Sequence, residues 1–252
     1  MRGVRLVVVG GSSGIGRAIA QRAGELGAAV VVSARRADRL AELAGCIPIV
    51  ADVRRVEDCE RLGRDAAHEL GEIDLLVYAA GTSPLRLLAD IGDEDWQAVL
   101  ETNLLGAHHV VTSVLPFLSR RAVVSFISSD SVVAPRPGLV PYAASKGALE
   151  ALVRGFRTEH PSTRFTCCSI GPTFPTGFAD GFDLAAFEGV LEHWSRLGMG
   201  TDGPTMTTES VAEFALTTLH LLLSNPTVSM DHVLLQPVAV DAPLAADAPL
   251  TT

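Results

Sequence analysis

One tyrosine and one lysine in this sequence have the types and the spacing needed for acid–base chemistry. Tyr142 precedes Lys146 by four positions, and Ser129 lies thirteen positions before the tyrosine. At the start of a helix, a spacing of four places the phenol and the ammonium on the same face. A cation held there favours the phenolate, so it lowers the pKa of the tyrosine.

The energy available from this pair matches what the chemistry requires. A free tyrosine titrates near ~10, so proton transfer at neutral pH needs a pKa lower by roughly 2–3, which corresponds to about 3–4 kcal/mol. One ammonium at ~4.5 Å in an effective dielectric of ~20 supplies about 3.7 kcal/mol. The same spacing also occurs in surface helices without chemical function, so the interpretation depends on the rest of the chain.

Size and composition indicate one compact α/β domain. The 252 residues are 48% hydrophobic and 19% charged, and no apolar run approaches the length of a membrane-spanning helix. The net charge of −9 argues against nucleic acid and anionic membranes as partners. The four cysteines are Cys46, Cys59, Cys167 and Cys168. They lack metal-ligand spacing, so we expect buried thiols in a reduced, cytoplasmic protein.

Short β-branched runs alternate with helical patterns along the chain. The runs show little polar alternation, which is typical of strands in a sheet covered on both faces. This alternation predicts right-handed βαβ units and a doubly wound parallel sheet. The predicted strands are Val4–Val9, Ala29–Ser33, Ile47–Val50, Leu75–Tyr78, Val123–Ile127, Phe165–Ser169 and His232–Leu235. The predicted helices are Ile15–Leu26, Ala37–Ala44, Val56–Leu70, Glu94–Leu118, Ala144–His160 and Glu209–Leu223.

Two segments depart from this regular alternation. Residues 174–207 contain glycines, prolines and aromatics, and they indicate an insertion before the last helix and strand. Residues 243–252 are rich in Ala, Pro and Asp and indicate a C-terminal tail. We therefore expect a single domain over residues 1–242.

A glycine-rich loop follows the first predicted strand and begins the first predicted helix. Glycine permits the turn and lets a pyrophosphate approach the free N–H groups and the positive end of the helix dipole. The strand–turn–helix context is the one that a dinucleotide-binding motif requires, and a tight turn without a ligand is the alternative. The loop residues expected to contact a dinucleotide are Gly10, Ser12, Ser13, Gly14, Ile15 and Gly16.

The end of the second predicted strand bears on the choice of cofactor. A carboxylate there binds the free ribose 2′-hydroxyl of NAD, whereas arginine suits the 2′-phosphate of NADP. Ala34 occupies the position of the expected acid, and Arg35 and Arg36 follow it. Arg17, directly after the glycine loop, can point at the same phosphate. NADP is therefore predicted, with NAD as the alternative.

Together these features resemble the short-chain dehydrogenase/reductase family over nearly the whole chain. The resemblance implies a Rossmann-like fold and hydride transfer between a nicotinamide cofactor and a ketone or secondary alcohol. A non-catalytic dinucleotide-binding regulator with the same fold is the alternative function. The matching pieces are Gly10–Gly16, Asp52, Ala79–Gly81, Asn103, Ile127–Ser129, Tyr142–Lys146 and Gly171–Pro172.

The resemblance also implies a role for each residue of the site. Ser129 would hydrogen-bond the substrate oxygen, and Tyr142 would exchange a proton with it. Lys146 would lower the tyrosine pKa and bind the nicotinamide ribose, while Asn103 would hold a water that relays protons to the lysine. Further contacts to the cofactor are implied for Asp52, Val53, Ala80, Gly81, Tyr142, Lys146, Gly171, Pro172, Thr173 and Thr176.

Four residues differ from the pattern of the family. Val9 stands where a threonine usually precedes the first glycine, and Ile170 replaces the usual proline before Gly171. Tyr78 and Ala79 replace the asparagines that commonly open the motif after the fourth strand. None of these differences touches the four residues with expected chemical roles.

The resemblance implies that residues 174–207 cover the active site as a substrate lid. The segment is rich in apolar side chains, and Arg196 is its only arginine or lysine. A pocket for a carboxylate or phosphate would offer more cations, so we expect a neutral, largely apolar substrate. Packing of the lid onto the domain is the alternative role for these apolar side chains.

The helix around Asn103 and the helix after Tyr142 carry apolar residues on more than one face. One sheet face cannot cover all of them, so we expect a helix-to-helix homodimer, doubled into a homotetramer as is usual in the resembling family. His108 and His109 diverge by ~100° on a helix and cannot jointly bind one metal ion. We predict no metal site.

Overall fold

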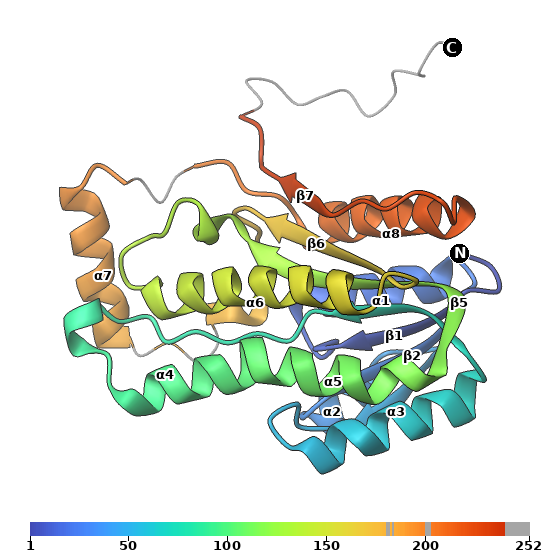
Figure 1. Ribbon diagram of the computed structural model, residues 1–252. Helices are drawn as coiled ribbons and strands as arrows, with labels where there is room; N and C mark the ends of the chain where they lie inside the picture. The colour runs from blue at the N-terminus through green and yellow to red at the C-terminus, as the bar shows by residue number, and fades with distance from the viewer. Residues whose placement is uncertain (180–181, 183, 200–202, 240–252) are drawn as a thin grey trace, which may run out of the picture.

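The computed structural model describes residues 1–179, 182, 184–199 and 203–239 (Figure 1). In this part of the chain, seven strands form one parallel sheet in the order β3-β2-β1-β4-β5-β6-β7. The strands are β1 (Arg5–Val9), β2 (Ala29–Ala34), β3 (Cys46–Val50), β4 (Ile73–Tyr78), β5 (Leu118–Ser129), β6 (Arg164–Ile170) and β7 (His232–Leu235). The strand order reverses direction between β1 and β4, which confirms the doubly wound, Rossmann-like α/β fold.

Helices cover both faces of the sheet (Figure 1). One hydrophobic core lies between the sheet and α3, α5 and α6, and a second lies between the sheet and α1, α2 and α8. These helices are α1 (Gly14–Glu25), α2 (Ala37–Ala41), α3 (Val56–Leu70), α5 (Gly106–Val114), α6 (Val140–Glu159) and α8 (Thr208–Ser224). The two others are α4 (Asp93–Leu100) and α7 (Leu184–Arg196).

Adjacent strand residues divide between the two cores, because side chains alternate across a strand. In β6, Cys167 packs into the first core and Cys168 into the second, and both are buried. Burial raises the pKa of each of these thiols to about 12. Cys59 is also buried, whereas Cys46 is partly exposed, and all four are free. The expectation of buried thiols holds for three of the four.

The long helix predicted over 94–118 is wrong as a single element. The structure has α4, a π-helical turn at Glu101–Leu105, α5, and a short 3₁₀ turn at Leu115–Phe117. Leu118 already begins β5, five residues before the predicted strand start. Pro116 lies in the 3₁₀ turn, where it has no backbone N–H to continue an α-helix.

The reversal of strand order places two loops next to each other. Gly10 follows β1 and Ala79 follows β4, and the Ala79 N–H donates to the carbonyl of Val9 at 2.7 Å. In doubly wound sheets, ligands bind in the crevice at the carboxyl ends of the strands where the order reverses. The predicted cofactor loop therefore lies at the crevice that the topology creates.

The predicted domain boundaries are only partly covered by the described residues. The tail at 243–252 lies outside them, and so do lid residues 180–181, 183 and 200–202. Figure 1 shows α7, the helix within the predicted lid, beyond the edge toward which the strand arrows point. The boundaries 1–242, 174–207 and 243–252 stay predictions. Among the described residues, no helix is long and apolar enough to cross a membrane.

Candidate active site

The hydroxyl groups of Ser129 and Tyr142 come together from two elements. Ser129 is the last residue of β5, and Tyr142 lies in the first turn of α6, which has Pro141 near its start. Proline suits this position because the first N–H groups of a helix lack intrahelical partners. The Ser129 side chain hydrogen-bonds to Tyr142 and thereby lowers its pKa. The two predicted hydroxyls therefore meet.

Lys146 and Asn103 meet beside Gly81, at the start of the loop after β4. A Cβ atom on Gly81 would lie 3.5 Å from Lys146 Nζ and 3.6 Å from Asn103 Oδ1. Lys146 Nζ donates to the carbonyl of Ile127 at 2.7 Å and lies 5.6 Å from the centroid of the Tyr142 ring. The four residues predicted to have chemical roles therefore surround one point at the carboxyl edge of the sheet.

Asn103 is fully buried and is fixed by three hydrogen bonds. Its Oδ1 accepts from the Thr82 N–H at 2.8 Å, and its Nδ2 donates to the Thr82 carbonyl and to Ser145 Oγ, each at 2.9 Å. Ser145 Oγ in turn donates to the carbonyl of Tyr142 at 2.7 Å. Asn103 thus ties the loop after β4 to the first turn of α6. The water relay expected through Asn103 stays a prediction.

The predicted lowering of the Tyr142 pKa by Lys146 is wrong for the protein without a bound cofactor. Burial is the largest influence and raises the pKa of Tyr142 to about 12, while the Ser129 hydrogen bond lowers it and the Asp130 charge raises it. Burial also lowers the pKa of Lys146 to about 8. Desolvation of the phenol therefore sets the direction of the shift, and Lys146 is not among the groups that move the Tyr142 pKa.

Sequence reasoning missed several side chains that arrange the site. Ser145 joins Asn103 to Tyr142, and Ser131 Oγ lies 3.0 Å from Ser129 Oγ. Asp130 Oδ1 lies 3.3 Å from the same hydroxyl. These residues stand inside or directly after the recognised motifs. Their hydroxyl and carboxyl groups were the available signal, but their directions depend on contacts between elements far apart in the sequence.

The glycine loop is packed too closely for side chains at Gly10, Gly11 and Gly16; a Cβ atom on Gly11 would lie 2.2 Å from Val32 Cγ2. A Cβ atom on Gly10 would lie 2.4 Å from the Ala80 nitrogen, and one on Gly16 would lie 2.4 Å from the Gly10 carbonyl oxygen. Gly10 also has φ +90°, which favours glycine. At Gly14 the nearest atom is Thr176 Cβ at 3.5 Å, so the predicted lid touches the loop here.

The start of α1 fits a pyrophosphate. Ser13 is the N-cap residue but its side chain makes no capping hydrogen bond, and the first turn of α1 contains no acidic residue. The free N–H groups and the positive end of the helix dipole therefore lack a side-chain acceptor of their own. This is the arrangement in which helix N-termini bind phosphate groups.

The three arginines predicted for the 2′-phosphate differ in their surroundings. Arg36 donates to Ser12 Oγ at 2.9 Å and to Ser13 Oγ at 3.0 Å, so it lies directly over the glycine loop. Arg17 instead forms an ion pair with Glu42 at 3.1 Å. Arg35 is exposed and lies close enough to Asp52 to lower the pKa of that carboxyl group. Arg36 is the best placed of the three.

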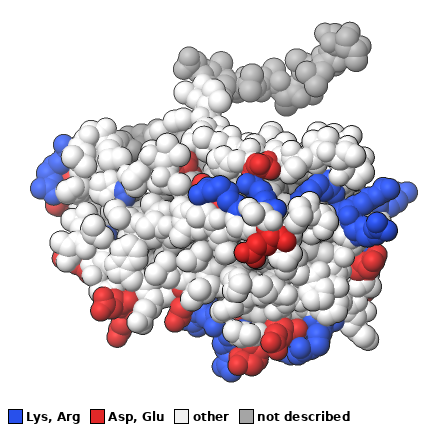
Figure 2. Space-filling view, viewed as in Figure 1, with Lys and Arg blue, Asp and Glu red and all other residues white. Residues whose placement is uncertain are grey.

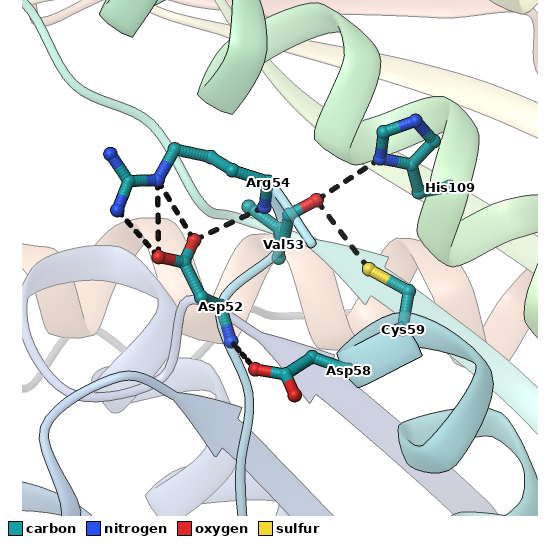
Figure 3. A network of polar contacts seen from close by, with 6 residues as sticks. All are labelled: Asp52, Val53, Arg54, Asp58, Cys59 and His109. Carbon is teal, nitrogen blue, oxygen red and sulfur yellow. Dashed lines mark hydrogen bonds and ion pairs between the residues drawn. The ribbon is translucent and has the colours of Figure 1, made fainter. Parts of the chain in front are cut away.

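Figure 3 shows the turn after β3, where contacts to adenine were expected. The Asp52 carboxylate accepts hydrogen bonds from Arg54, at 2.6 Å to Nη2, and this contact lowers the pKa of Asp52. The Asp52 N–H donates to Asp58 Oδ2 at 2.9 Å. The Val53 carbonyl lies 3.5 Å from Cys59 Sγ and 3.3 Å from His109 Nδ1. The turn is therefore held by α3 and α5.

His109 has a structural contact with the turn after β3. Its ring nitrogen faces the Val53 carbonyl, and its ring centroid lies 5.9 Å from that of His108. In the described part of the chain, no group of three or more His, Cys, Asp or Glu residues could hold a metal ion.

The segment after β6 packs against Tyr142 and the glycine loop. The Phe178 ring packs edge-on against Tyr142 with centroids 5.0 Å apart, and Phe182 packs against Phe178 at 5.5 Å. Thr173 Oγ1 donates to the Gly171 carbonyl at 3.0 Å, so its hydroxyl is used locally. Thr176 touches the glycine loop at Gly14 and is the better candidate of the two for a cofactor contact. Pro172 accepts the Met206 N–H through its carbonyl at 2.9 Å.

Comparison with known proteins agrees with this geometry. The family model of the short-chain dehydrogenases matches residues 5–179. The oxidoreductase YvrD of Bacillus subtilis is 31% identical over 192 residues, which cover 72% of this chain and 73% of that protein. The L-fucose dehydrogenase of Oryctolagus cuniculus is 34% identical over 175 residues, which cover 66% of this chain and 61% of that enzyme.

Solved structures show the same architecture. An alcohol dehydrogenase from the archaeon Thermococcus sibiricus, complexed with 5-hydroxy-NADP, superposes with a TM-score of 0.78 at 25% identity and covers 92% of this chain and 96% of that chain. A dehydrogenase/reductase from Sinorhizobium meliloti superposes with a TM-score of 0.75 at 27% identity, over 93% and 94% of the two chains. The protein therefore belongs to the short-chain dehydrogenase/reductase family, as an NAD(P)-dependent oxidoreductase acting on CH–OH or C=O groups.

Proposed function

We propose that this protein is an NADP-dependent carbonyl reductase or alcohol dehydrogenase that acts on a neutral, largely apolar ketone or secondary alcohol. The observation that carries the proposal is the meeting of Ser129, Tyr142, Lys146 and Asn103 beside Gly81. These groups lie next to a glycine loop that fits a dinucleotide. The net charge of −9 and the four free cysteines support a cytoplasmic location.

A bound nicotinamide would supply or accept the hydride. Ser129 and Tyr142 would both hydrogen-bond the substrate oxygen, on which negative charge develops as hydride arrives. With a pKa of about 12, Tyr142 is a neutral phenol at pH 7 and is ready to donate its proton to that oxygen. This protonation state supports the reductive direction. In oxidation, Tyr142 would have to become a phenolate, which the positive charge of an oxidised nicotinamide would favour.

The preference for NADP rests on Arg36. Its guanidinium is anchored by the hydroxyls of Ser12 and Ser13, at the place where the ribose of a dinucleotide on this loop would lie. Ala34, at the end of β2, offers no carboxylate to a ribose 2′-hydroxyl. Guanidinium groups bind phosphate with paired, charge-assisted hydrogen bonds.

The preference for an uncharged substrate rests on the surfaces around Tyr142 and Thr82. Phe178 and Phe182 form an apolar cover next to Tyr142. A cavity of 220 Å³ opens between the loop after β4, α4 and the lid, beside Thr82. Its two charged residues, Arg86 and Asp95, form an ion pair at 3.3 Å and neutralise each other. A substrate carboxylate or phosphate would have to compete with Asp95 for Arg86.

The test is a screen of ketones and alcohols with NADPH, NADH, NADP and NAD, followed by absorbance of the reduced nicotinamide. We expect turnover of apolar ketones with NADPH, and loss of at least about 1,000-fold in kcat for Tyr142→Phe with cofactor affinity changed less than a few-fold. Higher kcat/KM for phosphorylated or carboxylated substrates would contradict the substrate class. Tight NADP binding without turnover of any substrate would favour the non-catalytic regulator.

Arg36→Ala tests the cofactor preference separately. Removing the guanidinium should raise KM for NADPH by roughly 10–100-fold, the range expected for lost hydrogen bonds to a charged group, and leave KM for NADH nearly unchanged. Arg39→Ala is the matched control, because Arg39 is an exposed arginine on the neighbouring helix α2. Equal effects of Arg36→Ala on the two cofactors would contradict the proposed phosphate contact.

A further inference from the structure

Tyr78 is a fully buried tyrosine at the end of β4, in place of the asparagine common in the family. Its ring packs against Phe126 with centroids 6.4 Å apart. Its hydroxyl donates to the carbonyl of Thr102 at 2.5 Å. Burial raises the pKa of Tyr78 well above its usual value, so the phenol remains a neutral donor. This hydrogen bond joins the sheet to the residue directly before Asn103.

The acceptor belongs to the π-helical turn between α4 and α5. This turn runs from Glu101 to Leu105 and is closed by a hydrogen bond from the Gly106 N–H to the Glu101 carbonyl. A π-turn contains one more residue than an α-helical turn, and such turns are rare and are often found at functional sites. Each residue advances an α-helix by about 100°, so a return to regular α-helix would rotate Asn103 away from its partners.

Tyr78 packs closely against the start of α5 at Gly106. A Cβ atom on Gly106 would lie 2.7 Å from Tyr78 Oη and 2.7 Å from Val53 Cγ2. Glycine at the start of α5 therefore lets the helix approach the tyrosine closely enough for the hydroxyl to reach Thr102. The hydroxyl fills the space at this junction as well as donating a hydrogen bond.

The π-turn is connected to the chemistry through Asn103. The Asn103 amide binds both backbone groups of Thr82 and the hydroxyl of Ser145, and Ser145 binds the carbonyl of Tyr142. A shift of the π-turn would therefore loosen the loop after β4 and the first turn of α6 together.

We propose that Tyr78 is a positioning residue for the reaction: its hydroxyl holds the π-turn in the register that directs Asn103 toward Thr82 and Ser145. The proposal rests on the proposed function for its kinetic consequence. The structural consequence, a π-turn held by one phenolic hydrogen bond, does not depend on activity.

Tyr78→Phe removes the hydroxyl and keeps the buried ring. We expect kcat to fall about tenfold and KM for the cofactor to change less than about twofold, because an unpaired buried carbonyl favours rearrangement of the turn. Thr112→Val is the matched control. Thr112 Oγ1 also donates to a helix carbonyl, that of His108 at 2.9 Å, but on the exposed side of α5 away from the π-turn. Its kcat should equal that of the wild type.

A double-mutant cycle separates positioning from general destabilisation. If Tyr78 acts through Asn103, Tyr78→Phe should reduce kcat less than about twofold in an Asn103→Ala background. Where that background has no measurable turnover, Ser145→Ala replaces it. The same tenfold loss in the variant background would overturn the proposal, as would an unchanged kcat for Tyr78→Phe alone.

Hydrogen exchange of the backbone amides at 101–106 gives an answer without any substrate. Tyr78→Phe should exchange these amides at least about tenfold faster than wild type, and Thr112→Val should not. Absence of wild-type turnover would defeat the proposed function and leave this exchange result to decide whether Tyr78 holds the turn. Unchanged exchange at 101–106 would overturn the structural part of the inference.

Discussion

Tyr142 is influenced by three neighbours that act in different directions. Burial, with Phe178 packed against the ring, favours the neutral phenol. The hydrogen bond from Ser129 favours the phenolate, and the negative charge of Asp130 disfavours it. The proton that the reaction needs is therefore controlled by Ser129 at the end of β5, by Asp130 directly after it, and by burial that includes the Phe178 contact.

Substitution of Asp130 and Ser129 should move the pH dependence in opposite directions. Asp130→Asn removes a negative charge and should lower the Tyr142 pKa, so the alkaline rise in kcat/KM for alcohol oxidation moves to lower pH. Ser129→Ala removes a hydrogen bond to the phenolate and should move that rise to higher pH, with a fall in kcat of roughly 100-fold. The measurement is kcat/KM against pH for both variants. Shifts in the same direction would contradict this account.

Lys146 should make stability depend on pH in a defined window. Burial lowers its pKa to about 8 from a usual value of 10.5, so the unfolded chain binds more protons between these values. Below pH 8 the free energy of unfolding carries the full cost of burying the charge, which is about 3 kcal/mol. This cost disappears as the pH rises from 8 to 10.5. Urea unfolding of wild type and Lys146→Met should therefore show a difference that favours wild type increasingly from pH 8 upward. A difference that stays flat would contradict the burial of a charged amine.

Among the helices, close approach is controlled by glycine at particular contacts. A Cβ atom on Gly63 in α3 would lie 2.4 Å from the Ser113 carbonyl oxygen in α5. The backbones of these two helices are therefore in direct contact at Gly63. Gly155 in α6 has no atom within 4 Å of such a Cβ. Packing therefore requires glycine at position 63, whereas nothing in the described packing requires it at position 155.

The pair gives a stability prediction outside the active site. Gly63→Ala should destabilise the fold by about 1–3 kcal/mol through overpacking. Gly155→Ala should stabilise it by about 0.5–1 kcal/mol, because alanine loses less entropy in a helix. Thermal unfolding measures both, and kcat of the folded enzyme should be unchanged in each. A destabilised Gly155→Ala would indicate that α6 has a close neighbour in an assembly.

At the scale of the whole molecule, the exposed apolar side chains indicate where copies of this chain could associate. Much of the apolar character behind the predicted helix-to-helix dimer lies in the core of the single chain: Val110, Val111, Val114, Leu149 and Val153 are buried, while Leu105 is 46% exposed. Other exposed apolar side chains lie on α8 and the edge strand β7, including Leu221 and Leu234. On the face shown in Figure 2, basic and acidic side chains lie in small mixed groups between broad uncharged areas.

We expect a homodimer or homotetramer, with a mass in light scattering that is a multiple of 26.5 kDa. Leu105→Glu should reduce the mass if the helices around Asn103 form the interface. Leu221→Glu should reduce it if α8 and β7 do, because an unpaired strand edge readily adds a partner. A monomeric mass for the wild type would contradict the prediction.

The order of elements and the type of site were predictable because they depend on local patterns. Apolar runs of β-branched residues mark strands, and the glycine loop between β1 and α1 marks the dinucleotide site, wherever the rest of the chain lies. The break in the helix at 101–105 was not predictable, since the apolar pattern from 94 to 118 is continuous. The π-turn depends on the close contact between Tyr78 in β4 and Gly106 in α5, two residues that are far apart in the sequence.

The amino-acid sequence therefore predicted which residues gather at the candidate site, but not their protonation. Types and spacing identify Ser129, Tyr142 and Lys146, and side-chain chemistry names what each can do. Whether the phenol is neutral depends on desolvation by Phe178 and on the charge of Asp130, and which arginine stands over the glycine loop depends on how α2 and α1 pack. Burial and distance are properties of the folded chain, and the energies of buried charges follow from them.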